Sequence, residues 1–337
     1  MRDLFLKAVT SQNKSGKIPI WCMRQAGRYM PSYRALRQKY SFLGLCKHPK
    51  LICEATELPL REFDFDAAIL FSDILLILEA LGGELSFDEE KGPQLAPAFE
   101  SESHLEKMNL DFLNQKLSFV FEAIRLLKSR LDVPLIGFAG SPFTLAAYLI
   151  EGGRSADFRK TKLFMLREPK LFTALLDKLC EATILFLNES IEAGCDAIQI
   201  FDSLSYQLTP HHFQQFSFLY TQKVFGALKA CPKILFCRGT THFIDPLAQL
   251  KIDALGVDTQ ADLSEMRKKV GPKMALQGNL DPQILLAGGA PLARETIYLL
   301  EKMNHDPGYI FNLGHGVLPQ TSSEAVSLLV QTVRDFS

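Results

Sequence analysis

The stretch IPIWCMRQAGRYMPSYRALRQKY, residues 18–40, joins a short apolar run to a cluster of arginines. The apolar run covers residues 18–22 and predicts a buried strand. Four arginines then follow within fourteen residues, with no Asp or Glu between them: Arg24, Arg28, Arg34 and Arg37. A solvated helix face more often alternates basic and acidic residues at three or four positions. The cluster therefore indicates either an exposed loop or a pocket for several carboxylates or phosphates.

Seven more apolar runs follow along the chain, each ending at a glycine or a polar residue. The eight runs are 18–22, 67–71, 133–138, 197–201, 233–237, 254–257, 274–278 and 309–313. Because they are continuous rather than alternating, they predict parallel strands that are buried on both faces. Helical spacing appears between them, over 114–131, 169–193, 212–230, 263–270, 292–303 and 322–336. Eight strands that alternate with helices predict a (β/α)8 barrel, and a doubly wound open sheet is the alternative topology.

Composition places this chain among large globular proteins. It has 337 residues, 47% of them hydrophobic, and no break in composition, so we expect one domain over 1–337 with an inserted hairpin around 83–99. The net charge of −1 excludes a global basic field for nucleic acid or an acidic membrane. Seven cysteines without a CxxC pair predict reduced thiols. With no signal-peptide pattern and no apolar segment of spanning length, we expect a soluble, cytoplasmic protein.

Polar residues follow each predicted strand, where the carboxyl ends of barrel strands meet at one mouth. They are Arg24 and Arg28, Ser72 and Asp73, Gly140 and Ser141, Asp202 and Ser203, Arg238, Asp258, Gln277 and Asn279, and His315. This set has no metal-ligand spacing, and no nucleotide-binding motif is present. The segments 277–282 and 314–316 follow the seventh and eighth strands, where barrels often hold phosphate, so a phosphosugar enzyme is one alternative.

Two residues of this set have both a structural and a functional interpretation. Asp73 lies within strongly apolar sequence, so it is either a helix N-cap or an ionised acceptor that stabilises a cationic intermediate. His315, between two glycines, is either a structural histidine or a general acid or hydrogen-bond donor to substrate. Tyr148 and Ser203 are candidate hydrogen-bond donors to an anionic ligand.

Six segments, taken together, resemble uroporphyrinogen decarboxylase in order and spacing along nearly the whole chain. They are PIWCMRQAGRYMPSYR (19–34), AAILFSDIL (67–75), GSPFTLAAYLIEGG (140–153), IQIFDS (198–203), LQGNLDP (276–282) and FNLGHGV (311–317). The resemblance implies a (β/α)8 barrel that forms a homodimer. It also implies decarboxylation of the four acetate side chains of uroporphyrinogen III to methyl groups, giving coproporphyrinogen III without cofactor or metal.

The resemblance also implies roles for individual residues. Asp73 would accept the inward-facing pyrrole N–H groups and stabilise the protonated ring, while Arg24, Arg28 and Arg37 hold substrate carboxylates. Arg24 would donate a proton, although the pKa of an arginine lies far above neutral, which leaves a water or a substrate acid as the alternative donor. The remaining expected substrate contacts are Gln25, Phe71, Tyr148, Phe201, Ser203 and His315.

Four positions depart from the pattern of the family. Phe143 and Thr259 stand where tryptophan is common, and Arg238 and Ala156 stand where lysine is frequent. The rival within the same superfamily is a zinc-dependent corrinoid methyltransferase, which needs ligands such as His-x-Cys, a spacing absent from this sequence. A tetrapyrrole carrier without activity is the non-enzymatic alternative.

Overall fold

A parallel sheet forms the centre of the molecule. The computed structural model describes residues 3–88 and 91–336. Within them, the seven strands of this sheet follow the order β1-β4-β5-β6-β7-β8-β9. Their bounds are β1 Ala68–Ile69, β4 Leu135–Gly140, β5 Ala197–Asp202, β6 Lys233–Cys237, β7 Ala254–Gly256, β8 Ala275–Gln277 and β9 Tyr309–Ile310. Each of these strands lies within or overlaps one of the predicted apolar runs, and every neighbouring pair is parallel.

The remaining run, 18–22, closes the sheet into a barrel. Ile20 forms a parallel bridge with Phe311, next to β9, and its carbonyl accepts a hydrogen bond of 2.8 Å from the Asp66 N–H, next to β1. The two edge strands therefore meet the same segment, as they do in a barrel and not in an open sheet. The (β/α)8 prediction is confirmed and the doubly wound alternative is wrong, although residues 18–22 contribute a single bridge rather than a full strand.

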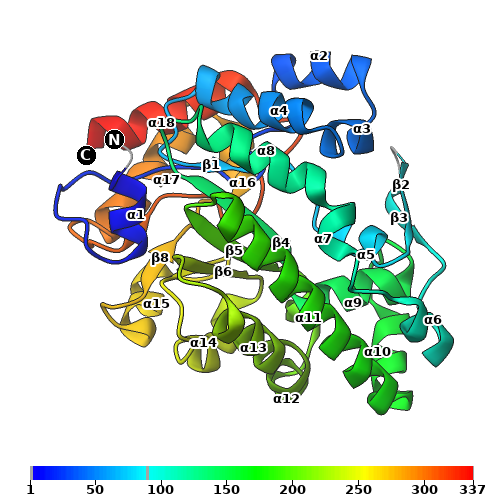
Figure 1. The fold of residues 1–337 in the computed structure, drawn as a ribbon. Helices are drawn as coiled ribbons and strands as arrows, with labels where there is room; N and C mark the ends of the chain where they lie inside the picture. Colours follow the sequence, from blue (N-terminus) through cyan, green and yellow to red (C-terminus); the bar gives the residue numbers. More distant parts are fainter. Residues whose placement is uncertain (1–2, 89–90, 337) are drawn as a thin grey trace.

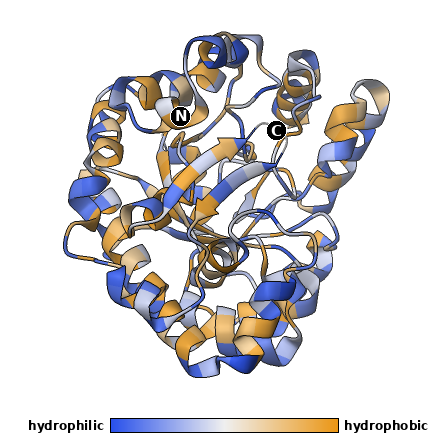
Figure 2. Cartoon of the chain, turned by 90° about the vertical axis from the view of Figure 1, so that its right-hand side faces the viewer, coloured by the Kyte–Doolittle hydropathy of each residue, from blue (hydrophilic) through white to orange (hydrophobic). Residues whose placement is uncertain are grey.

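Helices surround the strands (Figures 1 and 2). Their bounds are α1 Asp3–Val9, α2 Pro31–Lys39, α3 Phe42–Cys46, α4 Pro49–Glu62, α5 Leu76–Ala80, α6 Glu102–Lys107, α7 Leu113–Lys116, α8 Ser118–Lys128, α9 Pro142–Glu151, α10 Arg159–Arg167, α11 Pro169–Ala193, α12 Pro210–Phe213, α13 Leu219–Ala227, α14 Thr240–Leu247, α15 Leu263–Val270, α16 Pro282–Ala287, α17 Gly289–Lys302 and α18 Ser323–Phe336. Two predicted helices differ: 114–131 is divided at Leu117, and 212–230 contains a π-helical turn over Gln214–Phe218. None of the described helices is long and apolar enough to span a membrane.

The barrel interior is filled by side chains from every side of the sheet. Buried residues of the strands pack there against Phe5 of α1, which covers one end of the barrel. A polar layer lies within this core, because the Trp21 indole N–H donates to Gln277 Oε1 at 2.9 Å and Gln277 Nε2 donates to Gln199 Oε1 at 3.1 Å. Because the interior is filled, we expect a functional site at the other end of the barrel, where the strands have their carboxyl ends.

An antiparallel hairpin stands at that end, on the side of the molecule opposite α1 in Figure 1. It consists of β2 (Glu84–Asp88) and β3 (Gly92–Ala96), and residues 89–90 of the expected insertion lie outside the described part of the chain. The hairpin is attached to the end of α9, because Leu95 N–H donates to the Gly152 carbonyl at 3.0 Å and Gln94 bridges Gly153. This attachment brings the hairpin beside the helix that carries Tyr148.

Candidate active site

Arg24 lies on the first loop of the mouth, directly after the inward-facing Trp21 and Met23. The loop is fixed by Asn312, whose Oδ1 accepts the Met23 N–H at 3.0 Å. Arg24 has a φ of +61°, a left-handed conformation that costs a non-glycine residue about 1–2 kcal/mol and so needs support from its surroundings. Its side chain lies across Gly316, where an added Cβ would stand 2.6 Å from Arg24 Cγ. Glycine at 316 is therefore required by the path of the arginine.

Arg24 is exposed to solvent, yet many protein atoms surround its guanidinium. Burial lowers the pKa of Arg24. The neighbouring Tyr148 and Asp73 oppose that effect, whereas Arg154 and Arg28 add to it. Side chains from three separate segments, 24–28, 73 and 148–154, therefore interact electrostatically at the mouth.

Asp73 lies in the turn before α5. Its Oδ1 accepts the Leu75 N–H at 2.8 Å and so orders this turn, but α5 has no side-chain N-cap, and the expected acceptor role stays a prediction. The other oxygen, Oδ2, has no hydrogen-bond partner within residues 3–88 and 91–336. Burial raises the pKa of Asp73 to about 6, and the Leu75 N–H and Arg24 hold it from rising further. The carboxylate is thus an acceptor with little hydration and a free oxygen.

Tyr148 and His315 both interact electrostatically with Arg24. Burial raises the pKa of Tyr148, and the charge of Asp73 raises it further. Burial lowers the pKa of His315 to about 4, with additional contributions from Arg24 and Arg238. His315 Nδ1 accepts the Gly316 N–H at 2.6 Å, which leaves Nε2 to carry the proton. Both side chains are therefore neutral hydrogen-bond donors near neutral pH.

Aromatic rings border the polar groups. Phe71 contacts the rings of Tyr33 and Phe42 at centroid distances of 5.7 and 5.9 Å. Phe201, on β5, contacts Phe138 and Phe236 at 5.5 and 5.9 Å. Phe71 and Phe201, both expected to contact the substrate, therefore belong to two separate clusters of aromatic rings.

The other three arginines of the opening stretch differ in their contacts. Arg28 is exposed and acts electrostatically on Arg24. Arg37, on α2, forms a side-chain hydrogen bond with Tyr33 and lies 5.7 Å from the centroid of the Phe42 ring. Arg34 instead donates to the carbonyls of Arg28 and Tyr29 at 2.9 and 2.8 Å, so it holds the loop. No Asp or Glu of the described residues forms an ion pair with Arg24, Arg28 or Arg37.

Gln25 faces the protein rather than the mouth. Its side chain is 1% exposed, accepts the Cys22 N–H at 3.4 Å and donates to the Ala67 carbonyl at 3.3 Å. Its own carbonyl accepts the Tyr29 hydroxyl at 2.7 Å. Its side chain thus positions the arginine loop against β1, and the substrate contact expected at Gln25 stays a prediction.

Ser203 is half-buried at the end of β5, beside the buried carboxylate of Asp202. The Asp202 carboxylate accepts hydrogen bonds from the hydroxyls of Ser141 at 2.9 Å and Thr144 at 3.2 Å, and from Ser217. The sequence placed Asp202 and Ser141 at the mouth, but it did not predict the hydrogen bonds that join them. These hydrogen bonds join the end of β5, where Ser203 lies, to the start of α9, the helix that carries Tyr148.

The four atypical positions have different surroundings. The Phe143 ring is 2% exposed and packs on Phe172 at 6.5 Å, within the helix layer. The backbone of Thr259 lies against Gly314, and Ala156 is exposed. Arg238 lies over the Tyr206 ring, with its Cζ 4.1 Å from the centroid, and it acts on His315. Of the four, Arg238 is therefore the residue that affects the electrostatics of the mouth.

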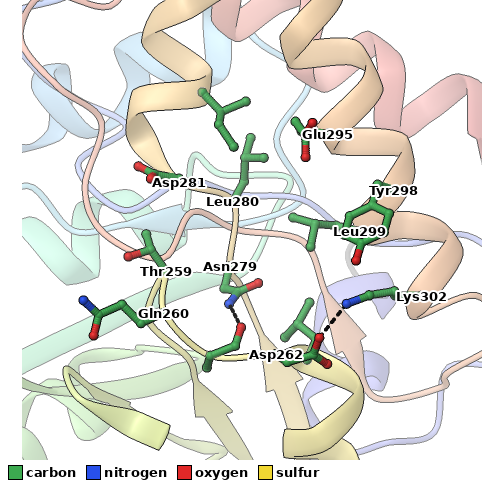
Figure 3. A pocket seen from close by; sticks show the side chains of 13 residues that line it. Thr259, Gln260, Asp262, Asn279, Leu280, Asp281, Glu295, Tyr298, Leu299 and Lys302 are labelled. Carbon is green, nitrogen blue, oxygen red and sulfur yellow. Dashed lines mark hydrogen bonds and ion pairs between the residues drawn. The ribbon is translucent and has the colours of Figure 1, made fainter.

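The phosphosugar alternative meets an obstacle at α16. The Asp281 side chain accepts the Gln283 N–H at 2.8 Å, so a carboxylate already occupies the N-terminus where a phosphate would bind. A cavity of about 320 Å³ lies beside this helix (Figure 3). It is lined by three carboxylates, Asp262, Asp281 and Glu295, and by Lys302, which bonds Asp262 at 2.6 Å. None of the residues expected to contact a tetrapyrrole lines it, whereas Thr259, Asn279 and Asp281 do. No group of three potential metal ligands was found among residues 3–88 and 91–336.

The fold and these contacts define a class: a (β/α)8 barrel that gathers arginines and one carboxylate at the carboxyl ends of its strands, where barrels of this kind carry their active sites. A family model described as uroporphyrinogen decarboxylase (URO-D) matches residues 1–336. The chain belongs to the uroporphyrinogen decarboxylase family.

Individual relatives agree with this assignment. The chain is 46% identical over 334 residues to the uroporphyrinogen decarboxylase of Protochlamydia amoebophila, covering 99% of this chain and 92% of the relative. It is 41% identical to that of Methylococcus capsulatus, covering 100% of this chain and 98% of the relative. Among solved structures, a methyltransferase from Methanosarcina mazei matches with a TM-score of 0.82 at 21% identity, covering 99% of this chain and 98% of that one. At that identity the likeness shows the fold alone.

Proposed function

We propose that the protein is a carboxy-lyase that converts uroporphyrinogen III to coproporphyrinogen III by replacing four acetate carboxylates with protons. Membership of the family and identities of 40–46% to curated decarboxylases support this reaction. The observation that carries the proposal is the arginine cluster, which forms no ion pair with a carboxylate among the described residues, together with the electrostatic effect of Asp73 on Arg24. In a protein with a net charge of −1, anions from a ligand are the natural complement of that cluster.

The substrate presents eight carboxylates around one macrocycle, so it needs several cations in a fixed arrangement. Arginine suits this task, because its planar guanidinium binds a carboxylate through two parallel hydrogen bonds. We assign Arg24, Arg28 and Arg37 to substrate carboxylates. Arg37 is ordered by Tyr33 and Phe42 before any ligand binds, which reduces the entropy lost on binding.

Asp73 is assigned to the inner side of the macrocycle. Loss of CO2 directly from a pyrrole acetate would leave a carbanion. Protonation of the ring carbon beside the substituent avoids this, because the electron pair of the breaking C–C bond then enters the cationic ring and forms an exocyclic methylene. A second proton adds to that methylene to give the methyl group, and the ring loses its added proton. The unbonded Oδ2 of Asp73 accepts the pyrrole N–H groups and stabilises the cation, an interaction strengthened by low hydration.

Arg24 is assigned to proton delivery, either directly or through a water that it holds. The surrounding protein atoms lower the pKa of Arg24, and Arg154 and Arg28 lower it further, which makes this guanidinium a stronger acid than an isolated arginine side chain. Its side chain lies across Gly316, and Asp73 acts on it electrostatically. The group that supplies the proton and the group that stabilises the resulting charge are thus neighbours.

The remaining expected contacts divide by chemistry. Tyr148, Ser203 and His315 are assigned to hydrogen bonds with the substrate, and the neutral His315 suits a donor to a carboxylate. Phe71 and Phe201 are assigned to the faces of the pyrrole rings, where they limit access of water. Gln25 supports the arginine loop from behind.

An anaerobic assay with uroporphyrinogen III tests the proposal, with loss of carboxylates followed by chromatography of the oxidised products. We expect stepwise appearance of species with seven, six, five and four carboxylates. Tight binding of the substrate with no product would support the carrier instead. A single tightly bound zinc and thiol methylation would support the methyltransferase, which the curated relatives support less.

Two further properties belong to this proposal. We infer a homodimer from the resemblance to the family, and sedimentation of the purified protein tests it. We also infer a cytoplasmic location, which agrees with the free state of all seven cysteines. Secretion of the native protein with intramolecular disulfides would contradict that location.

A further inference from the structure

Arg154 is a cation at the mouth with no role in the arrangement described so far. It follows Gly152 and Gly153, which end α9 four residues after Tyr148 and have φ values of +75° and +146°. Both N–H groups return to the Tyr148 carbonyl, at 3.0 and 3.1 Å. Because Gly153 also bridges Gln94 of β3, the chain leaves the helix along the hairpin, and Arg154 begins there.

The side chain of Arg154 lies over the hairpin at Gly92. A Cβ added to Gly92 would stand 2.7 Å from Arg154 Nε and 2.9 Å from Cζ, so the guanidinium occupies the space that a side chain at 92 would take. Gly92 has a φ of +78°, which also favours glycine. The hairpin therefore provides a surface along which this arginine lies.

The positive charge of Arg154 acts on residues of the candidate site. Its positive charge affects both the Arg24 guanidinium and the Tyr148 hydroxyl, which belong to the candidate site. Within residues 3–88 and 91–336 no carboxylate forms an ion pair with Arg154, and its side chain is exposed. Arg159, five residues later, is exposed too but pairs with Asp157 at 3.2 Å. Unlike Arg159, Arg154 thus has no carboxylate partner among the described residues.

We propose that Arg154, laid across the β2–β3 hairpin over Gly92, binds a carboxylate of the tetrapyrrole substrate at the outer edge of the mouth. This inference rests on the proposed function, because the substrate is the source of the carboxylate. Arg154 then faces the substrate from the side of Tyr148, whereas Arg37 faces it from α2. The hairpin would determine how far from Asp73 that carboxylate is held.

Binding of uroporphyrin III, the oxidised octacarboxylate that cannot react, tests this inference by quenching of its fluorescence. The variants are Arg154→Gln, which keeps a long side chain over Gly92 without the charge, Arg154→Lys, which restores a charge, and Arg159→Ala as the matched control. We expect Arg154→Gln to weaken binding by about tenfold to a hundredfold, as for loss of a charge-assisted hydrogen bond. Arg154→Lys should recover part of the loss, and Arg159→Ala should bind as the native protein does.

The same variants are assayed for turnover of uroporphyrinogen III, where the KM of Arg154→Gln should rise more than its kcat falls. Binding by Arg154→Gln within twofold of the native protein would overturn the inference. So would equal losses for Arg154→Gln and Arg154→Lys, because a purely structural role does not depend on charge. A native protein that binds uroporphyrin but decarboxylates nothing would refute the proposed function, while the binding comparison would still decide the role of Arg154.

Discussion

Replacement of Asp73 by asparagine should stabilise the fold while it abolishes turnover. The substitution keeps an oxygen for the Leu75 N–H and removes the charge from a poorly hydrated position. Burial raises the pKa of the Asp73 carboxyl from its usual 3.8 to about 6, and such a difference corresponds to about 3 kcal/mol of unfavourable ionisation. Because solvent reaches part of the side chain, we reduce the expected gain in the free energy of unfolding to about 2 kcal/mol.

The size of this gain in stability depends on pH in a defined window. Below pH 4 both the folded and the unfolded protein hold the proton on Asp73, so the variant and the native protein should be equally stable. Between about pH 4 and 6 the folded protein keeps a proton that the unfolded chain loses, and the native protein becomes less stable as pH rises. Above pH 6 the penalty is constant. The gain from Asp73→Asn should therefore appear across this window and remain at neutral pH.

Denaturant unfolding at pH 4, 5, 6 and 7.5 measures the gain, and anaerobic turnover measures the loss of function. Asp111→Asn, at an exposed position, is the matched control and should change neither quantity. We expect a loss of turnover of at least about a thousandfold for Asp73→Asn, consistent with removal of the charge that stabilises the cation. A variant that is less stable than the native protein at pH 7.5, or one that gains stability equally at every pH, would refute the electrostatic reasoning. Substantial turnover would refute the catalytic role.

Three further outcomes are expected. Arg37→Ala should raise the KM for uroporphyrinogen by about tenfold with little change in kcat, since a carboxylate contact is lost; a fall in kcat alone would contradict this. Gly316→Ala should reduce kcat/KM by about tenfold or more by displacing Arg24, whereas Gly226→Ala, where an added Cβ meets no atom within 4 Å, should not; equal effects in turnover assays would argue against the steric reason. The kcat/KM should fall as pH drops through about 6, where Asp73 takes up a proton. The variant His315→Gln should show the same fall in its pH–rate profile, because the pKa of His315 is about 4. Loss of that fall in the variant would assign it to the histidine.

Local patterns were sufficient for the fold because the periodicity of apolar residues is a local property. The predicted bounds 169–193 and 263–270 coincide with α11 and α15, whose apolar positions recur at helical spacing without interruption. The run 18–22 was less well predicted, because its pairing depends on Phe311 and Asp66, both distant in sequence. The helix over 212–230 contains a π turn that no spacing rule indicates.

The sequence by itself determined the barrel, the positions of the strand ends and the presence of an arginine cluster without acidic partners, because each follows from residues that are neighbours in the chain. Only the tertiary structure decided what each side chain contacts. In the folded protein the Gln25 side chain is buried, the Arg34 guanidinium donates to two backbone carbonyls, and the Arg154 side chain lies over Gly92. It also raised the pKa of Asp73, since desolvation depends on atoms that distant segments bring together. Strand and helix patterns are local, whereas contact and electrostatic environment belong to the folded molecule.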